Sequence, residues 1–242
     1  MNRDYRKFTE MAKADFGLNA DDIMSNIEAM TPYILEEREM RVTQMDVFSR
    51  LMMDRIIWLS GAVGSDMADI VQAQLLFMDS IDKTKDITLY INTPGGSVLG
   101  GLGIVDVMDY VTPDIATTNL GMCASMGSVL LAAGTKGKRS SLKYSKVMTH
   151  QVSSGASGNV QDNRINHRES ERYNFLLFKR LGADTGKGWE KVLKDSERDR
   201  WYNSFEAKEY GLIDNIILPN GSKGIEDEMK GFDKYMKLVD KD

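Results

Sequence analysis

The chain has 242 residues, of which 42% are apolar and 28% are charged, and its formal net charge is −5. This length and composition are typical of a globular protein that buries a sizeable core, and one α/β domain can account for them. The mildly negative charge argues against a nucleic-acid partner or an anionic membrane surface, because such partners select an excess of lysine and arginine. No apolar run is long enough to cross a bilayer, so we expect no membrane partner either.

The chain is poor in cysteine and histidine, since Cys123 is its only cysteine and His150 and His167 are its only histidines. One cysteine cannot form an intrachain disulfide, and residues 1–30 lack the apolar core of a secretory signal, so we expect a cytoplasmic protein. None of these side chains has the spacing of a zinc site, so the sequence predicts no metal.

Strand-like and helix-like segments alternate through the middle of the chain. Apolar runs predict strands over residues 56–59, 87–91, 115–120 and 146–149, and helical spacing predicts helices over residues 67–81, 98–110 and 125–133. This alternation predicts a mostly parallel sheet with right-handed crossovers and helices on both faces. Catalytic groups are then expected at the carboxyl ends of the strands.

The later part of the chain is less regular. Residues 159–181 predict a long, charged helix without a broad apolar face, which either projects from the body or packs on another subunit. A short helix is expected over residues 205–210, with Ser204 as its N-cap and Gly211 at its end, followed by a strand over residues 213–218.

The two ends differ in composition from the middle. Residues 1–30 are polar, with a helix start at Asn19, and residues 219–242 form a linker and a charged tail. We therefore expect a polar N-terminal extension or propeptide over residues 1–30, a folded domain over residues 31–218 and a charged tail over residues 219–242.

Ser125 is a candidate nucleophile. It follows the small-residue segment 121–124, where a strand is expected to turn into a helix. Such a turn exposes the hydroxyl and leaves the first helical N–H groups free to bind an oxyanion. The same residues also fit a helix start packed on the sheet with Ser125 as its cap, and the G-x-S-x-G signature of hydrolases is absent.

His150 and Asp199 could complete a catalytic set with this serine. His150 follows the expected strand 146–149, which would hold a general base firmly, whereas His167 lies in a polar stretch. The plain alternative is a structural histidine. Asp199 lies in a charged cluster over residues 195–201, and sequence order leaves both an exposed cluster and a triad carboxylate open.

Gly95 and Gly96 follow the expected strand 87–91 and could either cradle a phosphate or present a bare N–H to an oxyanion. The dinucleotide fingerprint is not met here, and the glycine-rich stretch 182–188 lacks the spacing and the Ser/Thr of a P-loop. The sequence therefore predicts no nucleotide site and no cofactor.

Several of these segments together resemble the ClpP family, the proteolytic subunits of Clp proteases. They are Y-I-N-T-P-G-G at 90–96, A-S-M-G at 124–127 with L-L-A-A-G-T-K-G-K-R at 130–139, M-T-H-Q at 148–151, E-R-D-R at 197–200 and E-A-K-E-Y-G-L-I-D at 206–214. The resemblance runs in order from about Tyr33 to Leu218. Any one segment is a weak signal, whereas all of them in register are highly specific.

The resemblance implies a fold and an activity. The fold would be of the ClpP/crotonase type, a twisted α/β spiral of βαβ units, with the helix 159–181 as a projecting handle. The activity would be that of a serine endopeptidase, with Ser125 as nucleophile, His150 as general base and then acid, and Asp199 as the orienting acid. The backbone N–H groups of Gly96 and Met126 would form the oxyanion hole.

The resemblance also implies partners. The subunit would assemble with copies of itself into two stacked heptameric rings, with Arg198 reaching across the ring equator. Unfolded polypeptides would be the substrates. A hexameric AAA+ unfoldase of the ClpX, ClpA or ClpC type would deliver them, docking on pockets lined by Tyr90, Tyr110 and Leu142.

The chain departs from the family pattern at three places. Val152 stands where the family has proline after His-Gln, Thr88 replaces an aromatic residue of the docking pocket, and residues 38–43 lack the basic R-G-E-R of the axial segment. Two alternatives remain: a catalytically silent structural ring subunit and an acyl-CoA enzyme on the related crotonase fold. Silent paralogues lack triad residues, whereas this chain keeps all three.

Overall fold

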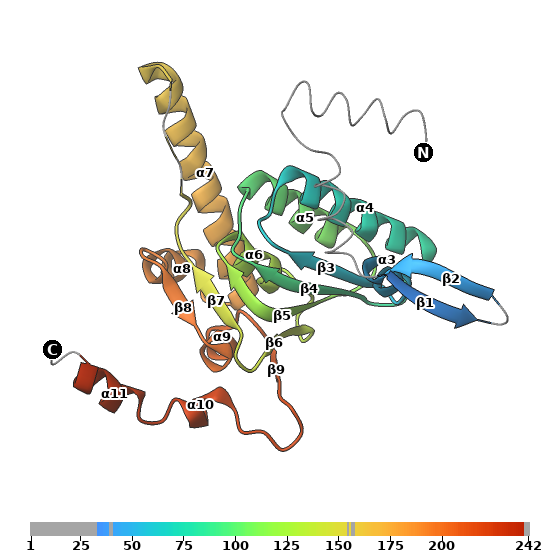
Figure 1. Cartoon of the computed structure of the whole chain (residues 1–242). Coiled ribbons are helices and arrows are strands. Elements are labelled where there is room, and N and C mark those ends of the chain that lie inside the picture. The colour runs from blue at the N-terminus through green and yellow to red at the C-terminus, as the bar shows by residue number, and fades with distance from the viewer. Residues whose placement is uncertain (1–32, 39–40, 154, 156–157, 240–242) are drawn as a thin grey trace, which may run out of the picture. The chain divides into compact units, whose positions relative to one another are not determined.

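The computed structural model describes residues 33–38, 41–153, 155 and 158–239, and it divides the chain into two units, Met1–Asp54 and Arg55–Asp242 (Figure 1). In the first unit, β1 (Tyr33–Arg38) and β2 (Arg41–Asp46) form an antiparallel hairpin that leads into α3 (Val47–Met53). The Asp46 carboxylate caps α3 by accepting the Ser49 N–H at 3.0 Å. None of these elements was predicted from the sequence. The predicted helix start at Asn19 lies outside the described residues.

The second unit is built on a seven-stranded sheet. Its main path runs β3 (Ile56–Ser60), β4 (Ile87–Thr93), β5 (Ile115–Ala124), β6 (Arg139–Leu142) and β9 (Asn215–Ile217), while β7 (Lys146–Thr149) pairs with β5 and β8 (Arg200–Tyr202) with β7. Every pairing is parallel except that of β7 with β8. The mostly parallel α/β sheet is therefore confirmed, while β6 and β8 were not predicted and β9 is shorter than the predicted strand 213–218.

Strand β5 forks the sheet. Its first half pairs with β6, in the register Thr117↔Arg139, and its second half pairs with β7, in the register Ala124↔Met148. The buried Asn119 side chain holds the fork, since its amide donates to the Lys146 carbonyl at 2.9 Å and accepts the Gly121 N–H at 3.1 Å. The strand thus runs on to Ala124, past the predicted end at residue 120, and delivers the chain to Ser125.

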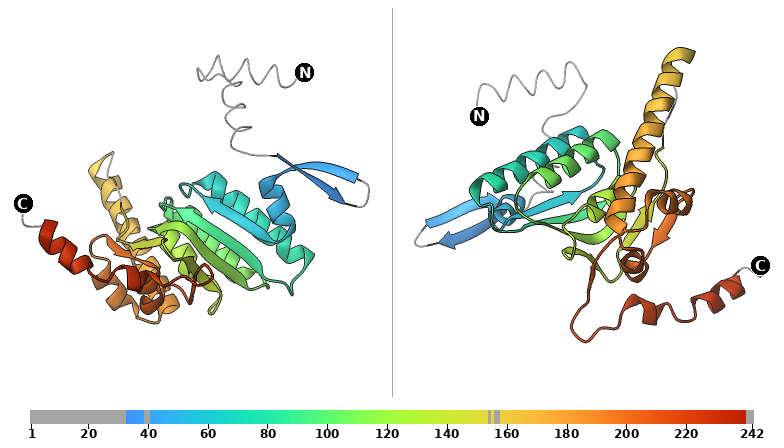
Figure 2. Two further views of the ribbon diagram at one scale, coloured as in Figure 1. Left: turned by 60° about the horizontal axis from the view of Figure 1, so that its bottom comes forward. Right: turned by 180° about the vertical axis from the view of Figure 1, so that it is seen from behind.

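Helices connect the parallel strands and pack on the sheet. α4 (Ser65–Ile81) and α5 (Val98–Tyr110) pack side by side, and α6 (Met126–Ala132) is wholly buried against β4 and β5 (Figures 1 and 2). The core between them consists of aliphatic side chains with almost no exposed surface, among them Leu75, Ile87, Leu89, Ile104, Leu130 and Leu131. These helices match the predicted ones within two residues at either end.

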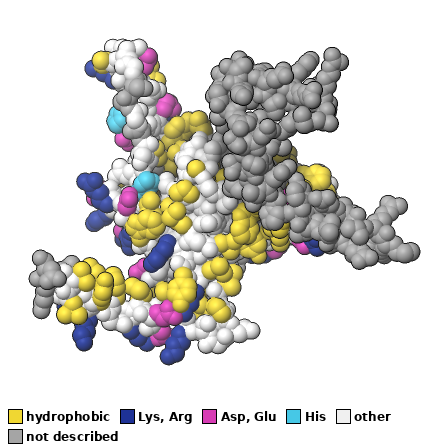
Figure 3. All heavy atoms as spheres, viewed as in Figure 1, with side chains coloured by type: hydrophobic (Ala, Val, Ile, Leu, Met, Phe, Trp, Pro, Cys, Tyr) yellow, Lys and Arg dark blue, Asp and Glu magenta, His cyan; other side chains and the backbone are white. Residues whose placement is uncertain are grey.

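Helix α7 (Val160–Thr185) is half core and half projection. The Asn159 side chain caps it by accepting the N–H groups of Gln161 and Asp162, and its last turns bury Leu177 and Phe178. Its first turns extend away from the sheet, with acidic and basic side chains at the tip (Figures 2 and 3). The predicted projecting helix is thus present and continues beyond residue 181 to Thr185. α8 (Trp189–Asp195), which the sequence analysis missed, packs beside its base.

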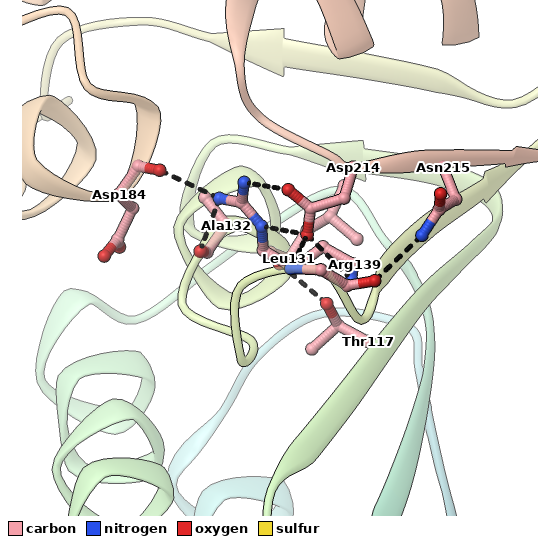
Figure 4. A network of polar contacts seen from close by, with 8 residues as sticks. Thr117, Leu131, Ala132, Arg139, Asp184, Asp214 and Asn215 are labelled. Atoms are coloured by element: carbon pink, nitrogen blue, oxygen red, sulfur yellow. Dashed lines mark hydrogen bonds and ion pairs between the residues drawn. The ribbon is translucent and has the colours of Figure 1, made fainter.

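A buried arginine ties the later elements to the sheet. Arg139 at the start of β6 forms a two-pronged ion pair with Asp214, at 2.8 Å from Nε and 2.6 Å from Nη2, and also donates to the carbonyls of Ala132 and Asp184 (Figure 4). Its side chain is only 3% exposed. One guanidinium therefore links the ends of α6 and α7 to the turn that precedes β9.

The C-terminal region corrects one prediction. α9 (Ser204–Tyr210) is capped by Asn203, not by Ser204, because Asn203 and Glu206 form a reciprocal capping box. Gly211 ends this helix at φ 91°, as expected. Beyond residue 219 the chain forms α10 (Ile225–Glu228), held to the body by an ion pair from Glu228 to Lys143, and α11 (Phe232–Val239), whose apolar side chains are exposed (Figure 3).

Candidate active site

Ser125 sits on a strained turn between β5 and α6. Its backbone has φ 54° and ψ −122°, a conformation that residues with a side chain rarely adopt and that is concentrated at functional sites. The Ser125 N–H donates to the Met148 carbonyl at 2.9 Å, which anchors the turn to β7. Ser125 occupies the N-cap position, but its side chain makes no capping hydrogen bond. The hydroxyl instead lies 2.8 Å from Nε2 of His150.

The Gly95–Gly96 turn packs against this serine at a distance that no side chain would allow. A Cβ on Gly95, at φ 96°, would lie 2.7 Å from Cβ of Ser125 and from the Ala124 carbonyl. A Cβ on Gly96, at φ 149°, would lie 2.4 Å from the Val63 carbonyl. Glycine is required at both positions for close approach as well as for backbone angle.

Two backbone N–H groups that line the cleft with the hydroxyl have no acceptor among the residues that the structure describes. Val63 and Gly96 form a parallel bridge. In this bridge the Val63 N–H donates to the Gly95 carbonyl and the Val63 carbonyl accepts the Ser97 N–H, so the N–H of Gly96 is not used. Met126 opens α6, where the N–H groups have no intrahelical acceptor. Within the described residues neither Gly96 nor Met126 has a partner for its N–H.

The register of β7 and β8 brings His150 and Asp199 together. Thr149 pairs with Arg200 across this antiparallel ladder, so the next step beyond the ladder sets His150 opposite Asp199. Nδ1 of His150 lies 3.2 Å from Oδ1 of Asp199. The histidine side chain is 23% exposed and the aspartate side chain 64% exposed. The structure thus places side chains that are 49 residues apart in the sequence within hydrogen-bond range.

Four of the five residues proposed for the triad and the oxyanion hole line one cleft of about 270 Å³. These four are Gly96, Ser125, Met126 and His150, whereas Asp199 contacts the other ring nitrogen of His150 and does not line the cleft. The cleft has an apolar wall contributed by Met126, Val129, Met148, Leu177, Phe178 and Leu181. His167, the other histidine, does not line this cleft. It lies on the exposed first half of α7, where its nearest charged partner is Glu171 at 3.9 Å.

The base of α7 is a part of this site that the sequence analysis missed. Asn174 lines the cleft and accepts the Val152 N–H at 3.1 Å, just past His150. Proline at position 152 would have no N–H to donate, so the departure at Val152 is accompanied by a hydrogen bond to the handle helix. A charged helix without a clear apolar face gave no signal that its last turns would form a wall of the site.

The described residues near Ser125 offer neither a reactive thiol nor a metal site. Burial raises the pKa of the Cys123 thiol well above its ordinary value, so this side chain is held in its unreactive protonated form two residues before Ser125. Among the residues that the structure describes, no group of His, Cys, Asp and Glu side chains is arranged to hold a metal ion. No helix in this part of the chain is long and apolar enough to cross a membrane.

The three residues implied in docking do not share one pocket. Leu142 lines an apolar hollow of about 510 Å³ with Leu120, Ile217, Leu218 and Pro219. Tyr90 and Tyr110 are not among the described residues that line it. Tyr90 packs edge-on against Trp58 instead, and the Tyr110 side chain stands largely in solvent.

Comparison with known proteins gives one consistent result. The family model described as Clp protease matches residues 37–220. A relative from Bacteroides fragilis (strain YCH46), named ATP-dependent Clp protease proteolytic subunit, is 49% identical over 219 residues, which cover 89% of this chain and 98% of the relative. Relatives with the same name from Bacteroides thetaiotaomicron and Porphyromonas gingivalis are 48% and 49% identical, and each is covered over 98% of its length. The chain therefore belongs to the Clp protease family.

Proposed function

We propose that this protein is a serine endopeptidase subunit that hydrolyses peptide bonds in unfolded polypeptides, with Ser125, His150 and Asp199 as its catalytic triad. The observation that carries the assignment is the position of His150, whose Nε2 lies 2.8 Å from the Ser125 hydroxyl while Nδ1 faces Asp199 at 3.2 Å. This geometry fits a nucleophile activated by an oriented general base.

The steps follow from that geometry. Oγ of Ser125 attacks the carbonyl carbon of the scissile peptide while Nε2 of His150 takes the hydroxyl proton. The oxyanion that forms accepts hydrogen bonds from the free N–H groups of Gly96 and Met126. The C–N bond then breaks as His150 returns its proton to the leaving amine. Water, activated by the same imidazole, hydrolyses the ester to Ser125 and restores the enzyme, while Asp199 stabilises each imidazolium.

A fluorophosphonate probe and a single substitution test this assignment. The probe should label Ser125 in the assembled protein, and Ser125→Ala should abolish both labelling and cleavage of a short fluorogenic peptide. Wild-type cleavage by Ser125→Ala would show that the nucleophile is elsewhere. Absence of labelling in a correctly assembled wild-type protein would favour the catalytically silent ring subunit, an alternative that no feature of the site favours.

We further propose that the subunit works inside a barrel of two stacked heptameric rings in the cytoplasm, fed by a ClpX-, ClpA- or ClpC-type AAA+ unfoldase. The names of the relatives include ATP dependence, whereas this sequence has no P-loop of its own. Arg198 and the projecting half of α7 would contribute to ring contacts, and the apolar hollow at Leu142, with Tyr90 and Tyr110, to docking.

An assay with two substrates tests the dependence on an unfoldase. Unfolding a stable domain costs about 5–15 kcal/mol, so a spontaneous opening is rare. A short fluorogenic peptide should be cleaved without ATP, and a tagged, stably folded protein should be degraded only when an unfoldase and ATP are present. Efficient degradation of the folded protein by this subunit alone would contradict the proposal.

The termini complete the proposal. We assign residues 31–218 to the protease domain, residues 1–30 to a polar extension or propeptide, and residues 219–242 to a charged tail. The match of the family model to residues 37–220 supports the boundaries of the middle region. Intact mass of the purified protein and of Ser125→Ala distinguishes a propeptide from an extension, because only self-processing would shorten the active form alone.

A further inference from the structure

The carboxylate of Asp199 makes few contacts with the described residues. Within the described part of the chain, Nδ1 of His150 is the hydrogen-bond partner that the structure gives it, and the aspartate side chain is 64% exposed. In a triad the acid must hold the imidazole in one orientation. Since the Asp199 side chain is mostly exposed, its position depends largely on the backbone that carries it.

That backbone is the loop from the end of α8 to the start of β8, and an ion pair closes it. Oδ1 of Asp195, the first residue of the loop, lies 2.9 Å from Nη1 of Arg200, the last. The Asp195 side chain is only 9% exposed, and its other oxygen accepts the Tyr210 hydroxyl at 2.8 Å. Asp199 is the residue directly before Arg200, so the closure acts one residue from the catalytic carboxylate.

The other side of Arg200 is also restrained. Its guanidinium lies over the rings of Tyr202 and Tyr210, at 5.0 Å and 5.1 Å from their centroids, and the two rings contact each other. Such stacking orients a guanidinium and leaves its edge free for a carboxylate. Arg200 is therefore fixed by two aromatic faces and by Asp195.

The start of the loop is fastened to the strand that carries the base. Oγ of Ser196 donates to Oγ1 of Thr149 at 2.9 Å, and both residues are buried. Thr149 directly precedes His150. The loop is thus attached to β7 at Ser196, paired with β7 at Arg200, and closed on itself between Asp195 and Arg200.

Asp195 is charged in this setting. Burial opposes its ionisation, but hydrogen bonds from Lys191 and Tyr210 and the charge of Arg200 outweigh burial and hold the pKa of Asp195 below its ordinary value. The pair with Arg200 is therefore ionic at neutral pH. The second cation, Lys191, lies 2.7 Å from the same oxygen but belongs to α8 and closes no loop.

We propose that Asp195 and Arg200 are positioning residues for proteolysis: their ion pair closes the loop over residues 195–200 and so holds the Asp199 carboxylate against His150. Neither side chain lines the substrate cleft, so they act through Asp199. The inference rests on the catalytic triad proposed above.

The first test is kinetic and uses the full-length assembled protein with a short fluorogenic peptide. Asp195→Asn keeps the shape of the side chain and removes its charge. It should lower kcat roughly 10- to 100-fold, the size expected when a catalytic group is slightly misplaced, and leave KM unchanged because the cleft is untouched. Arg200→Gln should behave alike, and Arg200→Lys should recover part of the loss. Lys191→Gln, the matched control at the same oxygen, should change kcat less than about twofold.

The second test asks whether the effect passes through Asp199. In the Asp199→Asn background, Asp195→Asn should lower kcat by less than about twofold, because residues that act through one group are not additive. A further loss as large as in the wild-type background would overturn the proposal, since it would mean a general structural defect. A wild-type kcat for Asp195→Asn would overturn it too.

The outcomes separate this proposal from the triad itself. A wild-type kcat for Asp199→Asn would refute the triad, and the positioning role with it. A large loss of kcat for Asp199→Asn together with a wild-type kcat for Asp195→Asn would refute only the positioning role. If Asp195→Asn fails to fold by circular dichroism and light scattering, Tyr210→Phe removes only the hydroxyl that donates to Asp195. It should then lower kcat in the same direction, and an unchanged kcat would count against the proposal.

Discussion

Gly95 lies so close to Ser125 that a Cβ on the glycine would fall 2.7 Å from Cβ of the serine. Such a distance is well inside van der Waals contact. The position of the turn over residues 93–97 therefore depends on the position of the turn at Ser125, and the reverse. The same turn carries the free N–H of Gly96. The proposed nucleophile and the proposed oxyanion hole are therefore positioned by the same close contact.

We expect Gly95→Ala to lower activity strongly. Alanine at a positive φ costs about 1–2 kcal/mol, and here its methyl group must also displace the Ser125 turn. A displacement of this kind should lower kcat/KM at least about 100-fold. Gly61→Ala is the matched control, because Gly61 has φ 80° but open space around its Cβ position. It also places alanine at a positive φ and should keep most of the activity. Equal losses in the two variants would argue that backbone strain alone matters.

The ion pair of Arg139 with Asp214 predicts a stability effect. Asp214→Ala would leave a guanidinium with a 3% exposed side chain without its counter-charge. Breaking a buried pair on one side costs about 3–5 kcal/mol. Urea unfolding at pH 7 should show a loss of that order. Asp86→Ala removes one carboxylate from the half-exposed Lys138 and should cost about 0–1 kcal/mol. Comparable losses in the two variants would contradict the structural role given to Arg139.

The same pair predicts a pH dependence. Burial raises the pKa of Asp214, but the hydrogen bonds and charge of Arg139 outweigh burial, so the folded pKa lies below the ordinary value of 3.8. The pair's stabilisation is therefore fully present above that ordinary value and is lost as pH falls through the lower folded pKa. The stability difference between wild type and Asp214→Ala should be constant from pH 7 to pH 5 and shrink below about pH 4. A difference that grows on acidification would reverse the sign of this linkage.

The contact between Val152 and Asn174 predicts a milder effect on activity. Asn174→Leu would remove the acceptor of the Val152 N–H and leave that donor unpaired beside the cleft. A lost hydrogen bond of this kind is worth about 1 kcal/mol, so kcat/KM should fall roughly fivefold. Asn166→Leu, on the exposed first half of the same helix, should leave peptide cleavage unchanged. An unaffected Asn174→Leu would show that the segment after His150 is held by other contacts.

The sequence could predict elements whose causes are local. The strand predicted over residues 56–59 and the helix predicted over residues 67–81 follow from apolar runs and helical spacing, and the structure has both, as β3 (Ile56–Ser60) and α4 (Ser65–Ile81). β6 was missed because three of its four residues, R-S-S-L, are polar, and because the counter-charge that lets Arg139 be buried, Asp214, lies 75 residues further along the chain. Asn203 was within reach, since Asn203 and Glu206 have the spacing of a capping box whereas Ser204 has Ala207 three residues on.

In the candidate site, too, features with local causes could be predicted and features that depend on long-range pairing could not. Ser125 and Gly96 became candidates because small residues at the ends of predicted strands indicate an exposed turn, whereas Met126 was implied by the family resemblance. Whether Asp199 reaches His150 could not be decided, because β8 has only three residues, R-W-Y, and is a strand through its pairing with β7. The family resemblance supplied the assignment, and the ladder from Thr149 to Arg200 supplies its physical cause.

The last prediction concerns assembly through the handle. The first half of α7 exposes Val160 and Ile165, which are 67% and 61% accessible in the single chain, among charged side chains. A helix that buries so little is marginal in water, so a partner surface would stabilise it. Light scattering of the wild type should give the mass of two stacked heptameric rings. Ile165→Glu should shift it toward a single ring, because a charge would have to be buried in the contact.

Gln161→Glu adds the same charge at an exposed position without removing an apolar group, and should remain assembled. A monomeric wild type at micromolar concentration would contradict the stacked barrel, and an intact double ring for Ile165→Glu would place the ring contact away from this side chain.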